Sequence, residues 1–239
     1  MALREDWADS IVVPFAQAAI PALPVITPVP SVGAPPTSGW RGKRALDLAF
    51  SAVLLVLLAP LMVVAALAVK LSSKGPVFFR QSRIGLGGKE FHILKFRTMC
   101  SDAEERLLTD RHLHGMYLDG GHKIPCRLDP RVTRVGRIFR TWSIDEMPQL
   151  LNVLLGHMSL VGPRPVVHGE LGRYGEHLGA YLALRPGLTG VWQTSGRNQI
   201  VFPARAELDA WYHVRCSPWV DLKILLKTPL SVLRRQGSE

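Results

Sequence analysis

The sequence predicts an α+β fold that is mainly helical, in which a membrane-embedded, re-entrant N-terminal helix broken at Pro60 precedes a small cytoplasmic domain. Three observations predict it. Residues 48–69 carry no charge, two alternating runs flank the segment GLGGK at residues 85–89, and helical patterns recur in the rest of the chain. They indicate a membrane helix, a β-hairpin and further helices. We expect a tail over residues 1–40, a membrane helix over 41–72 and the cytoplasmic domain over 73–239.

Residues 1–40 predict a disordered, partly polyproline-like tail. They hold seven of the 18 prolines and only four charged residues, and so many prolines leave no regular helix or strand. The early charges are of mixed sign and no apolar run precedes the prolines, so we do not expect a signal peptide.

Residues 48–69 predict the membrane helix. As a straight helix these 22 uncharged residues would be about 33 Å long, enough to cross a hydrocarbon core of about 30 Å. The alternative is a buried core helix, but a globular helix that is apolar on every side over six turns is unusual.

Pro60 and the flanking charges bear on whether this helix spans or re-enters. Pro60 removes one backbone hydrogen bond and predicts a kink, although a single proline is also tolerated in spanning helices. If both ends of the helix lie at the cytoplasmic face, the basic residues on both flanks satisfy the positive-inside rule. These residues are Arg41, Lys43 and Arg44 before the helix and Lys70 and Lys74 after it.

The composition indicates an anionic partner and a reducing compartment. Across 239 residues, 29 Lys and Arg stand against 19 Asp and Glu, for a net charge of +10. This favours nucleic acid, membrane headgroups or a phosphorylated substrate. The three cysteines form no Cys-x-x-Cys motif, which argues against a disulfide framework or a structural zinc site.

The C-terminal stretch VDLKILLKTPLSVLRR, residues 220–235, mixes aliphatic and basic residues. It suits interfacial helices on anionic lipid, broken near Pro229. Ordinary packing against the cytoplasmic domain is the alternative.

The stretch WSIDEMPQLLN places two carboxylates, Asp145 and Glu146, side by side. Ser143 and Glu146 match the spacing of a capping box, which would make the pair structural. Pro148 fits better if the helix begins nearer Asp145, with the proline in its first turn. The carboxylates would then lie at a helix start, where a phosphate and a divalent cation could both be held.

The stretch GPRP follows, and its glycine and two prolines predict a rigid loop that presents Arg164. Arginine suits bidentate phosphate recognition. A preceding basic segment, with Arg131, Arg134, Arg137 and Arg140 spaced by three residues, adds a broad cationic surface. Together with the membrane segment, these features fit phosphoryl transfer to or from a lipid.

The stretches KFRTM, DPRVTRVGRIFRTWSIDEMPQLLNVLLGHMSLVGPRP and RPGLTGVWQTSGRN resemble the bacterial sugar transferase family. These are monotopic polyprenyl-phosphate phosphoglycosyl transferases, and the chain resembles their short form over about residues 41–230. The resemblance implies transfer of hexose-1-phosphate from a UDP-sugar, such as UDP-glucose or UDP-galactose, to undecaprenyl phosphate with release of UMP. It also implies Mg²⁺ and a phospho-sugar bound covalently to aspartate.

Carried over residue by residue, the resemblance makes Asp145 the nucleophile and Glu146 a catalytic residue that helps to hold Mg²⁺. The sequence departs from the family pattern at Ala59, where many relatives have serine. It also has Pro203 and Ala204 where relatives often carry an acidic pair. The remaining residues implied are Arg140 and Arg164 for phosphate, Arg197 for the nucleotide-sugar, and Pro60 for the break in the membrane helix.

The resemblance further implies the bacterial inner membrane, with the catalytic domain facing the cytoplasm. The expected partners are membrane lipid and other polysaccharide-assembly enzymes. We expect no binding of nucleic acid. Two alternatives compete. A glycosyltransferase that moves the sugar alone would release UDP, but such enzymes commonly use Asp-x-Asp, which is absent from the sequence. A non-catalytic basic membrane module is favoured by the charge alone.

Overall fold

The structure is a computed structural model and describes residues 39–119, 124–196 and 199–233. The expected disordered tail, apart from residues 39 and 40, lies outside the described residues. The elements in chain order are α1 (Lys43–Ser72), β1 (Phe78–Ile84), η1 (Leu86–Gly88), β2 (Glu90–Phe96), α2 (Ala103–Thr109), α3 (Arg111–Asp119), α4 (Arg134–Trp142), η2 (Ile144–Glu146), α5 (Gln149–Leu154), β3 (Ser159–Val161), η3 (His168–His177), α6 (Leu178–Leu182), β4 (Gly187–Thr189), α7 (Val191–Ser195), α8 (Ala204–Arg215) and α9 (Pro218–Leu233).

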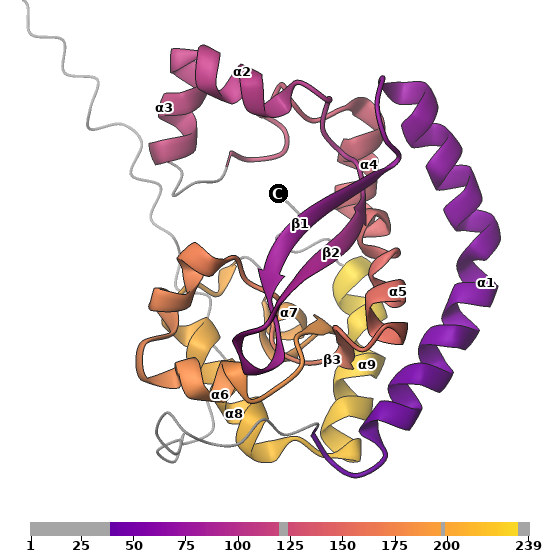
Figure 1. Ribbon diagram of the computed structural model, residues 1–239, viewed down its shortest axis with the longest axis vertical. Helices are drawn as coiled ribbons and strands as arrows, with labels where there is room; N and C mark the ends of the chain where they lie inside the picture. Colours follow the sequence, from indigo (N-terminus) through magenta and orange to yellow (C-terminus); the bar gives the residue numbers. More distant parts are fainter. Residues whose placement is uncertain (1–38, 120–123, 197–198, 234–239) are drawn as a thin grey trace, which may run out of the picture.

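The described chain is mainly helical and contains the predicted hairpin, which crosses the middle of the molecule in Figure 1. β1 and β2 are antiparallel, with Phe78 opposite Phe96. Their turn uses Gly87 and Gly88 at φ of 65° and 80°, a backbone region that glycine enters without a steric penalty. A second, parallel pair of short strands, β3 and β4, was not predicted.

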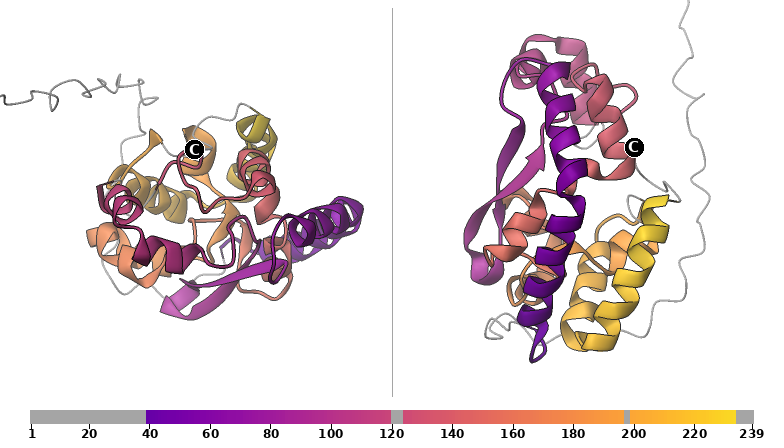
Figure 2. Two further views of the ribbon diagram at one scale, coloured as in Figure 1. Left: turned by 90° about the horizontal axis from the view of Figure 1, so that it is seen from above. Right: turned by 90° about the vertical axis from the view of Figure 1, so that its right-hand side faces the viewer.

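α1 is a single helix that runs through Pro60, so the predicted break there is wrong. Figure 1 shows the helix bowed along one side of the molecule, and Figure 2 shows it running nearly the full length of the described part. A proline removes one backbone N–H donor, while the helical turns on either side of it keep their backbone hydrogen bonds. Both halves of α1 also pack on the same domain, which favours a gentle bend over a break.

α1 turns one stripe to the domain and an apolar surface outward. Its buried residues recur mostly every four positions towards each end of the helix and so share one side: Lys43, Asp47, Ser51, Ala65 and Val69. Large apolar side chains are exposed elsewhere along it, including Phe50, Val53, Val56, Leu57, Leu61, Val64 and Leu71. Among the described residues α1 is the one helix long and apolar enough to cross a membrane. So large an exposed apolar surface marks an interaction with lipid or protein.

A buried ion pair fixes the start of α1. Lys43 Nζ donates to Asp221 Oδ2 at 2.5 Å, and the side chains of both residues are less than a tenth exposed. The Tyr212 hydroxyl donates to Asp221 Oδ1 at 2.6 Å and Trp40 Nε1 to Asp221 Oδ2 at 3.0 Å. Because loss of either charge would leave the other buried and unpaired, this network ties α1 firmly to α8 and α9.

The next turn of α1 is bonded to the centre of the domain. Arg44 donates to the carbonyl oxygens of Val153 and Leu154, at 2.6 and 3.0 Å, at the C-terminal end of α5. Asp47 Oδ1 accepts from the backbone N–H of Leu160 in β3 at 3.0 Å. These contacts satisfy helix-end and strand-edge groups that would otherwise lack partners, and they place α1 beside α5 and β3.

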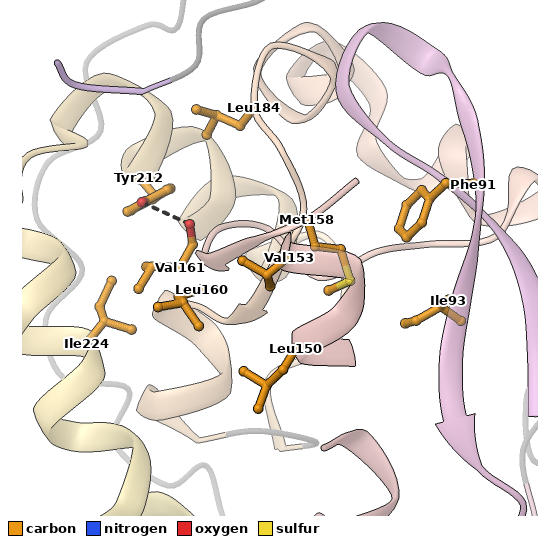
Figure 3. Packing of buried hydrophobic residues seen from close by; sticks show 10 residues of the cluster. All are labelled: Phe91, Ile93, Leu150, Val153, Met158, Leu160, Val161, Leu184, Tyr212 and Ile224. Carbon is orange, nitrogen blue, oxygen red and sulfur yellow. Dashed lines mark hydrogen bonds between the residues drawn. The ribbon is translucent and has the colours of Figure 1, made fainter. Parts of the chain in front are cut away.

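The main hydrophobic cluster joins the hairpin to α5. Phe91 and Ile93 of β2 face Leu150 and Val153 of α5, with Met158 beside them (Figure 3). Phe91 and Ile93 lie on the same face of β2, because successive side chains of a strand point to opposite faces. The residue that follows Ile93 on the same side of the strand is Lys95.

Asn152 on α5 occupies the outer edge of β2. Its side-chain oxygen accepts from the N–H of Leu94 at 2.9 Å, and its amide donates to the carbonyl of His92 at 2.8 Å. These are the bonds that a third strand would make at a free edge. The hairpin is thereby held in one register against α5.

α9 runs unbroken through Pro229, so the predicted interruption near that residue is wrong. Arg234 and Arg235 lie outside the described residues. The helix exposes an apolar stripe at helical spacing, namely Trp219, Leu222, Leu226, Leu230 and Leu233. This stripe has the pattern of a helix that lies at a membrane surface.

The fold makes one prediction about stability. Asp209 is buried and accepts from the Tyr174 hydroxyl at 3.0 Å. Burial raises the pKa of Asp209 to about 8 from a usual 3.8. The folded state therefore holds this proton more tightly than the unfolded chain does. The stabilisation is complete below pH 3.8 and is lost as the pH rises through about 8.

We expect Asp209→Asn, which keeps an acceptor for Tyr174 and cannot ionise, to remove this pH dependence. Between about pH 5 and about pH 8 the variant should gain melting temperature relative to the wild type. Thermal unfolding of the purified protein at several pH values measures the difference. A constant difference across that range would contradict the prediction.

Candidate active site

The two carboxylates lie on a short turn between α4 and α5. α4 begins with Thr133, whose hydroxyl accepts from the N–H of Gly136 at 2.9 Å, and it ends at Ser143 with φ of 56°. Ser143 makes no side-chain capping bond to the turn that follows, so the capping-box alternative is wrong. Asp145 and Glu146 occupy that turn, but α5 begins only at Gln149, directly after Pro148. The structure therefore differs from the predicted helix that begins nearer Asp145 with the proline inside its first turn. The left-handed Ser143 redirects the chain, so the pair faces the hairpin.

Lys95 on β2 meets both carboxylates. Its Nζ donates to Glu146 Oε1 at 2.7 Å and lies 3.9 Å from Asp145 Oδ2. Sequence reasoning quoted Lys95 only within the stretch KFRTM and assigned it no role. The signal that could have found Lys95 is the two-residue period of side chains along β2. This period puts Lys95 on the same side as Ile93 and towards α5.

The surroundings of Asp145 shift the pKa of its carboxyl group in opposite directions. The pKa of Asp145 is raised from 3.8 to about 6, chiefly by burial. The charges of Lys95 and Arg140 lower this pKa, and the charge of Glu146 raises it. The carboxyl is 8% exposed. At neutral pH it is therefore an ionised carboxylate with little water around it, a state that makes carboxylate oxygens reactive towards electrophiles.

Arg140 lies beside the pair, as predicted. It leaves α4 one turn before Asp145, and its Nε donates to Thr98 Oγ1 at 3.0 Å. Thr98 belongs to the segment that follows β2, and its carbonyl would lie only 2.0 Å from a Cβ on Gly136. α4 and the end of the hairpin are thus in direct backbone contact, which fixes Arg140 relative to Lys95.

A small cleft opens beside Glu146 and Lys95, which both line it. Arg164 lines it, as the phosphate-binding prediction requires, and Arg83 of β1 lines it as well. Sequence reasoning missed Arg83. The remaining lining residues come from β2, α5, the loop after β3, β4 and α7: Ile93, Gln149, Pro165, Gly187, Leu188 and Gln193.

The loop that carries Arg164 is held by backbone contacts with β4. The N–H of Gly162 donates to the carbonyl of Thr189 at 2.9 Å, and that of Gly187 donates to the carbonyl of Pro163 at 2.7 Å. A Cβ on Gly162 would lie 2.4 Å from the carbonyl oxygen of Arg185. The close approach of the two segments therefore depends on glycine.

Further arginines extend the positive charge beyond the cleft. The guanidinium groups of Arg164 and Arg205 lie 6.0 and 4.3 Å from the centre of the Trp192 ring. Arg83 lies 3.7 Å from Glu170. Burial lowers the pKa of Arg83 and of Arg205, and the charge of Arg164 lowers both further. An anionic ligand would relieve this repulsion between like charges.

Of the predicted functional residues, Pro60 is not part of this constellation. Pro60 lies on α1 and lines no part of the cleft, and Arg197 lies outside the described residues. The part of the chain that the structure describes contains no group of three or more His, Cys, Asp and Glu side chains that could hold a metal ion. A metal here would need oxygen ligands from the substrate in addition to the carboxylate pair.

The fold and the site define a domain with a long apolar helix and a cleft whose lining combines the Glu146 carboxylate with three basic side chains, an arrangement suited to phosphate-bearing substrates. The chain belongs to the bacterial sugar transferase family, which it matches over residues 38–235. The resemblance found from the sequence motifs is thereby confirmed.

Three relatives illustrate the family. The chain is 41% identical over 199 residues to the undecaprenyl-phosphate galactose phosphotransferase of Salmonella typhimurium, covering 82% of this chain and 41% of that protein. It is 42% identical over 201 residues to the exopolysaccharide production protein ExoY of Rhizobium meliloti, covering 84% and 89%. It is 46% identical over 201 residues to the UDP-glucose:undecaprenyl-phosphate glucose-1-phosphate transferase of Caulobacter vibrioides, covering 80% and 69%. The chain spans about two fifths of the length of several curated relatives that it matches, including the Salmonella protein.

The backbone packing around the loop predicts the effect of one substitution. Gly162→Ala should destabilise the protein by about 1–3 kcal/mol, because the new methyl group would overlap backbone atoms that cannot move aside. Gly172→Ala is the matched control, because nothing lies within 4 Å of a Cβ at that position. Thermal unfolding of both variants measures the effect. Equal melting temperatures for the two would contradict it.

Proposed function

We propose that this protein transfers hexose-1-phosphate from a UDP-sugar to undecaprenyl phosphate and releases UMP, the first membrane step of exopolysaccharide or capsule-type glycan assembly. The observation that carries the proposal is the Asp145–Glu146 pair beside Lys95, at a cleft that Glu146 lines together with Arg83 and Arg164. The names of the relatives support the same reaction. They include both galactose and glucose, so UDP-galactose and UDP-glucose are the candidate donors.

In the proposed first half-reaction, a carboxylate oxygen of Asp145 attacks the phosphorus that carries the hexose. A new oxygen–phosphorus bond forms, the bond to the bridging oxygen of the diphosphate breaks, and UMP leaves with that oxygen. The hexose-phosphate remains on Asp145 as an acyl phosphate. Lys95 and Arg140 offset negative charge where the anionic nucleophile approaches an anionic diphosphate.

In the proposed second half-reaction, a phosphate oxygen of undecaprenyl phosphate attacks the same phosphorus. The bond to Asp145 breaks, the carboxylate is regenerated, and the product is an undecaprenyl diphosphate that carries the hexose. Arg83 and Arg164 would hold the phosphates in the cleft. The lipid-linked product must then be consumed by glycan-assembly enzymes, which are the further partners that we propose.

We propose Mg²⁺ as the cofactor, with Glu146 as its ligand. Mg²⁺ is commonly held by one or two carboxylates together with substrate phosphates rather than by a cage of protein ligands. The Asp145–Glu146 pair, together with substrate phosphates in the neighbouring cleft, would provide this donor set. When bound, the metal would neutralise charge on the diphosphate.

We propose that the protein resides in the bacterial inner membrane with its catalytic domain facing the cytoplasm. Both ends of α1 contact that domain, through Lys43 at one end and Val69 at the other. A helix that spanned the membrane would carry one end away from it. The exposed apolar faces of α1 and α9 therefore favour a helix that enters the lipid from one side, as a re-entrant anchor does.

The central test concerns the carboxylate pair. Asp145→Asn should lower UMP release by at least about a thousandfold, because an amide cannot form the acyl phosphate. Glu146→Gln should lower it by about a hundredfold through weaker metal and charge placement. Loss of either charge at the turn should cost about 1 kcal/mol of stability, so both variants should fold.

The assay combines purified protein, Mg²⁺, undecaprenyl phosphate and a UDP-hexose, and it quantifies UMP and UDP separately. Glu104→Gln, an exposed carboxylate on α2, is the matched control and should behave as the wild type. Wild-type enzyme incubated without lipid acceptor should carry a hexose-phosphate on Asp145, which peptide mass spectrometry locates. Release of UDP would establish transfer of the sugar alone. An adduct on another residue would show that this other residue, and not Asp145, is the nucleophile.

The topology has its own test. In a variant without the native cysteines, Arg41→Cys and Lys74→Cys place one thiol at each exposed end of α1. We expect neither to react with a membrane-impermeant maleimide in intact cells and both to react after lysis. Labelling of one end in intact cells would show that α1 spans the membrane.

A further inference from the structure

Three side chains on the wall of the cleft hold buried polar atoms without a hydrogen-bond partner among the described residues. They are Gln149 Nε2, Gln193 Oε1 and Arg83 Nε. Buried polar groups in folded proteins are nearly always paired, so a cluster of exceptions in one cleft indicates a ligand that supplies the partners. Arg83 Nε suits a phosphate oxygen. The two glutamines call for a different chemistry.

The position of each glutamine is set by its local structure. Gln149 is the first residue of α5, directly after Pro148, and is 2% exposed. Gln193 lies on α7 and its amide packs against Gly190, where a Cβ would lie 2.6 Å from Gln193 Oε1. The missing side chain at Gly190 therefore leaves room for this amide. Gln149 and Gln193 both line the same cleft as Glu146.

The amide group distinguishes hydroxyls from phosphates. A phosphate oxygen only accepts hydrogen bonds, and lysine and arginine only donate them. A glutamine amide has one end of each kind, whichever way round its oxygen and nitrogen lie. A hydroxyl both donates and accepts, so it can satisfy either end. The cleft thus combines donors for phosphate with two amides that match a carbohydrate.

We propose that Gln149 and Gln193 bind hydroxyl groups of the hexose. The inference rests on the proposed function and deepens it, because it assigns the sugar part of the donor to a defined wall of the cleft. The two amides come from different elements, α5 and α7, and so approach the sugar from different directions.

The test pairs side-chain removal with hydroxyl removal. Gln193→Leu and Gln149→Met keep approximate size and remove both hydrogen-bonding ends. The substrates are the UDP-hexose that the wild type prefers and its 2-, 3-, 4- and 6-deoxy analogues. For the wild type, kcat/KM should fall about 10- to 100-fold for at least one analogue. Each variant should show a similar fall with the parent sugar and no further fall with the analogue that lacks its hydroxyl.

The control is Gln199→Leu, an exposed glutamine outside the lining of the cleft, which should match the wild type within about twofold. A second readout is the affinity for UDP, measured by calorimetry on the purified full chain. The proposal requires UDP affinity to stay within about twofold in both variants, because UDP has no hexose.

Two results would overturn the proposal. Equal losses for the parent sugar and every deoxy analogue would show that the glutamines only support the structure. A fall in UDP affinity that matches the fall in kcat/KM would assign them to the nucleotide. Failure of the proposed function is seen separately, because the wild type would then release no UMP from any UDP-hexose.

Discussion

The arrangement of the site depends on the contact between the hairpin and α5. Asn152 bonds to the peptide groups of His92 and Leu94, and Ile93 packs with Leu150 and Val153 below them. This fixes the register of β2, and the register decides where Lys95 falls. A shift by one residue would turn Lys95 away from α5 and remove its ammonium group from the two neighbouring carboxylates. Local strand geometry therefore sets the electrostatics of the cleft.

The second constraint is the attachment of α1. An apolar helix gains little from packing on a polar domain when lipid is available, so its position must be set by specific polar contacts. Lys43, Arg44 and Asp47 supply them, to α9, α5 and β3 in turn. Because α5 also follows the Asp145–Glu146 turn, the apolar helix and the carboxylates form one rigid unit. Such a unit holds the cleft at a constant height relative to whatever surface α1 enters.

Much of this could be predicted from the sequence, because the relevant signals were local. The uncharged run, the glycine turn of the hairpin and the pair at Asp145 each lie within a short stretch. The structure also brings Arg140 and Arg164 to the pair, as expected. Lys95, Arg83 and Gln193 were missed, because their roles depend on contacts between segments far apart in the chain. The break at Pro60 was wrong, because a lone proline removes one donor while packing along the whole helix preserves the rest.

The network around Asp221 has a consequence for protein engineering. Trp40 and Lys43 precede or begin α1, yet their partner Asp221 lies on α9, near the other end of the described chain. Any chimaera that exchanges this catalytic module with that of a longer relative should therefore be joined upstream of Trp40. A junction between α1 and β1 would take Trp40 and Lys43 from one parent protein. Their hydrogen-bond acceptor on α9 would then come from the other parent. Grafts cut there would lose a buried charge pair that matching of membrane-helix length cannot replace.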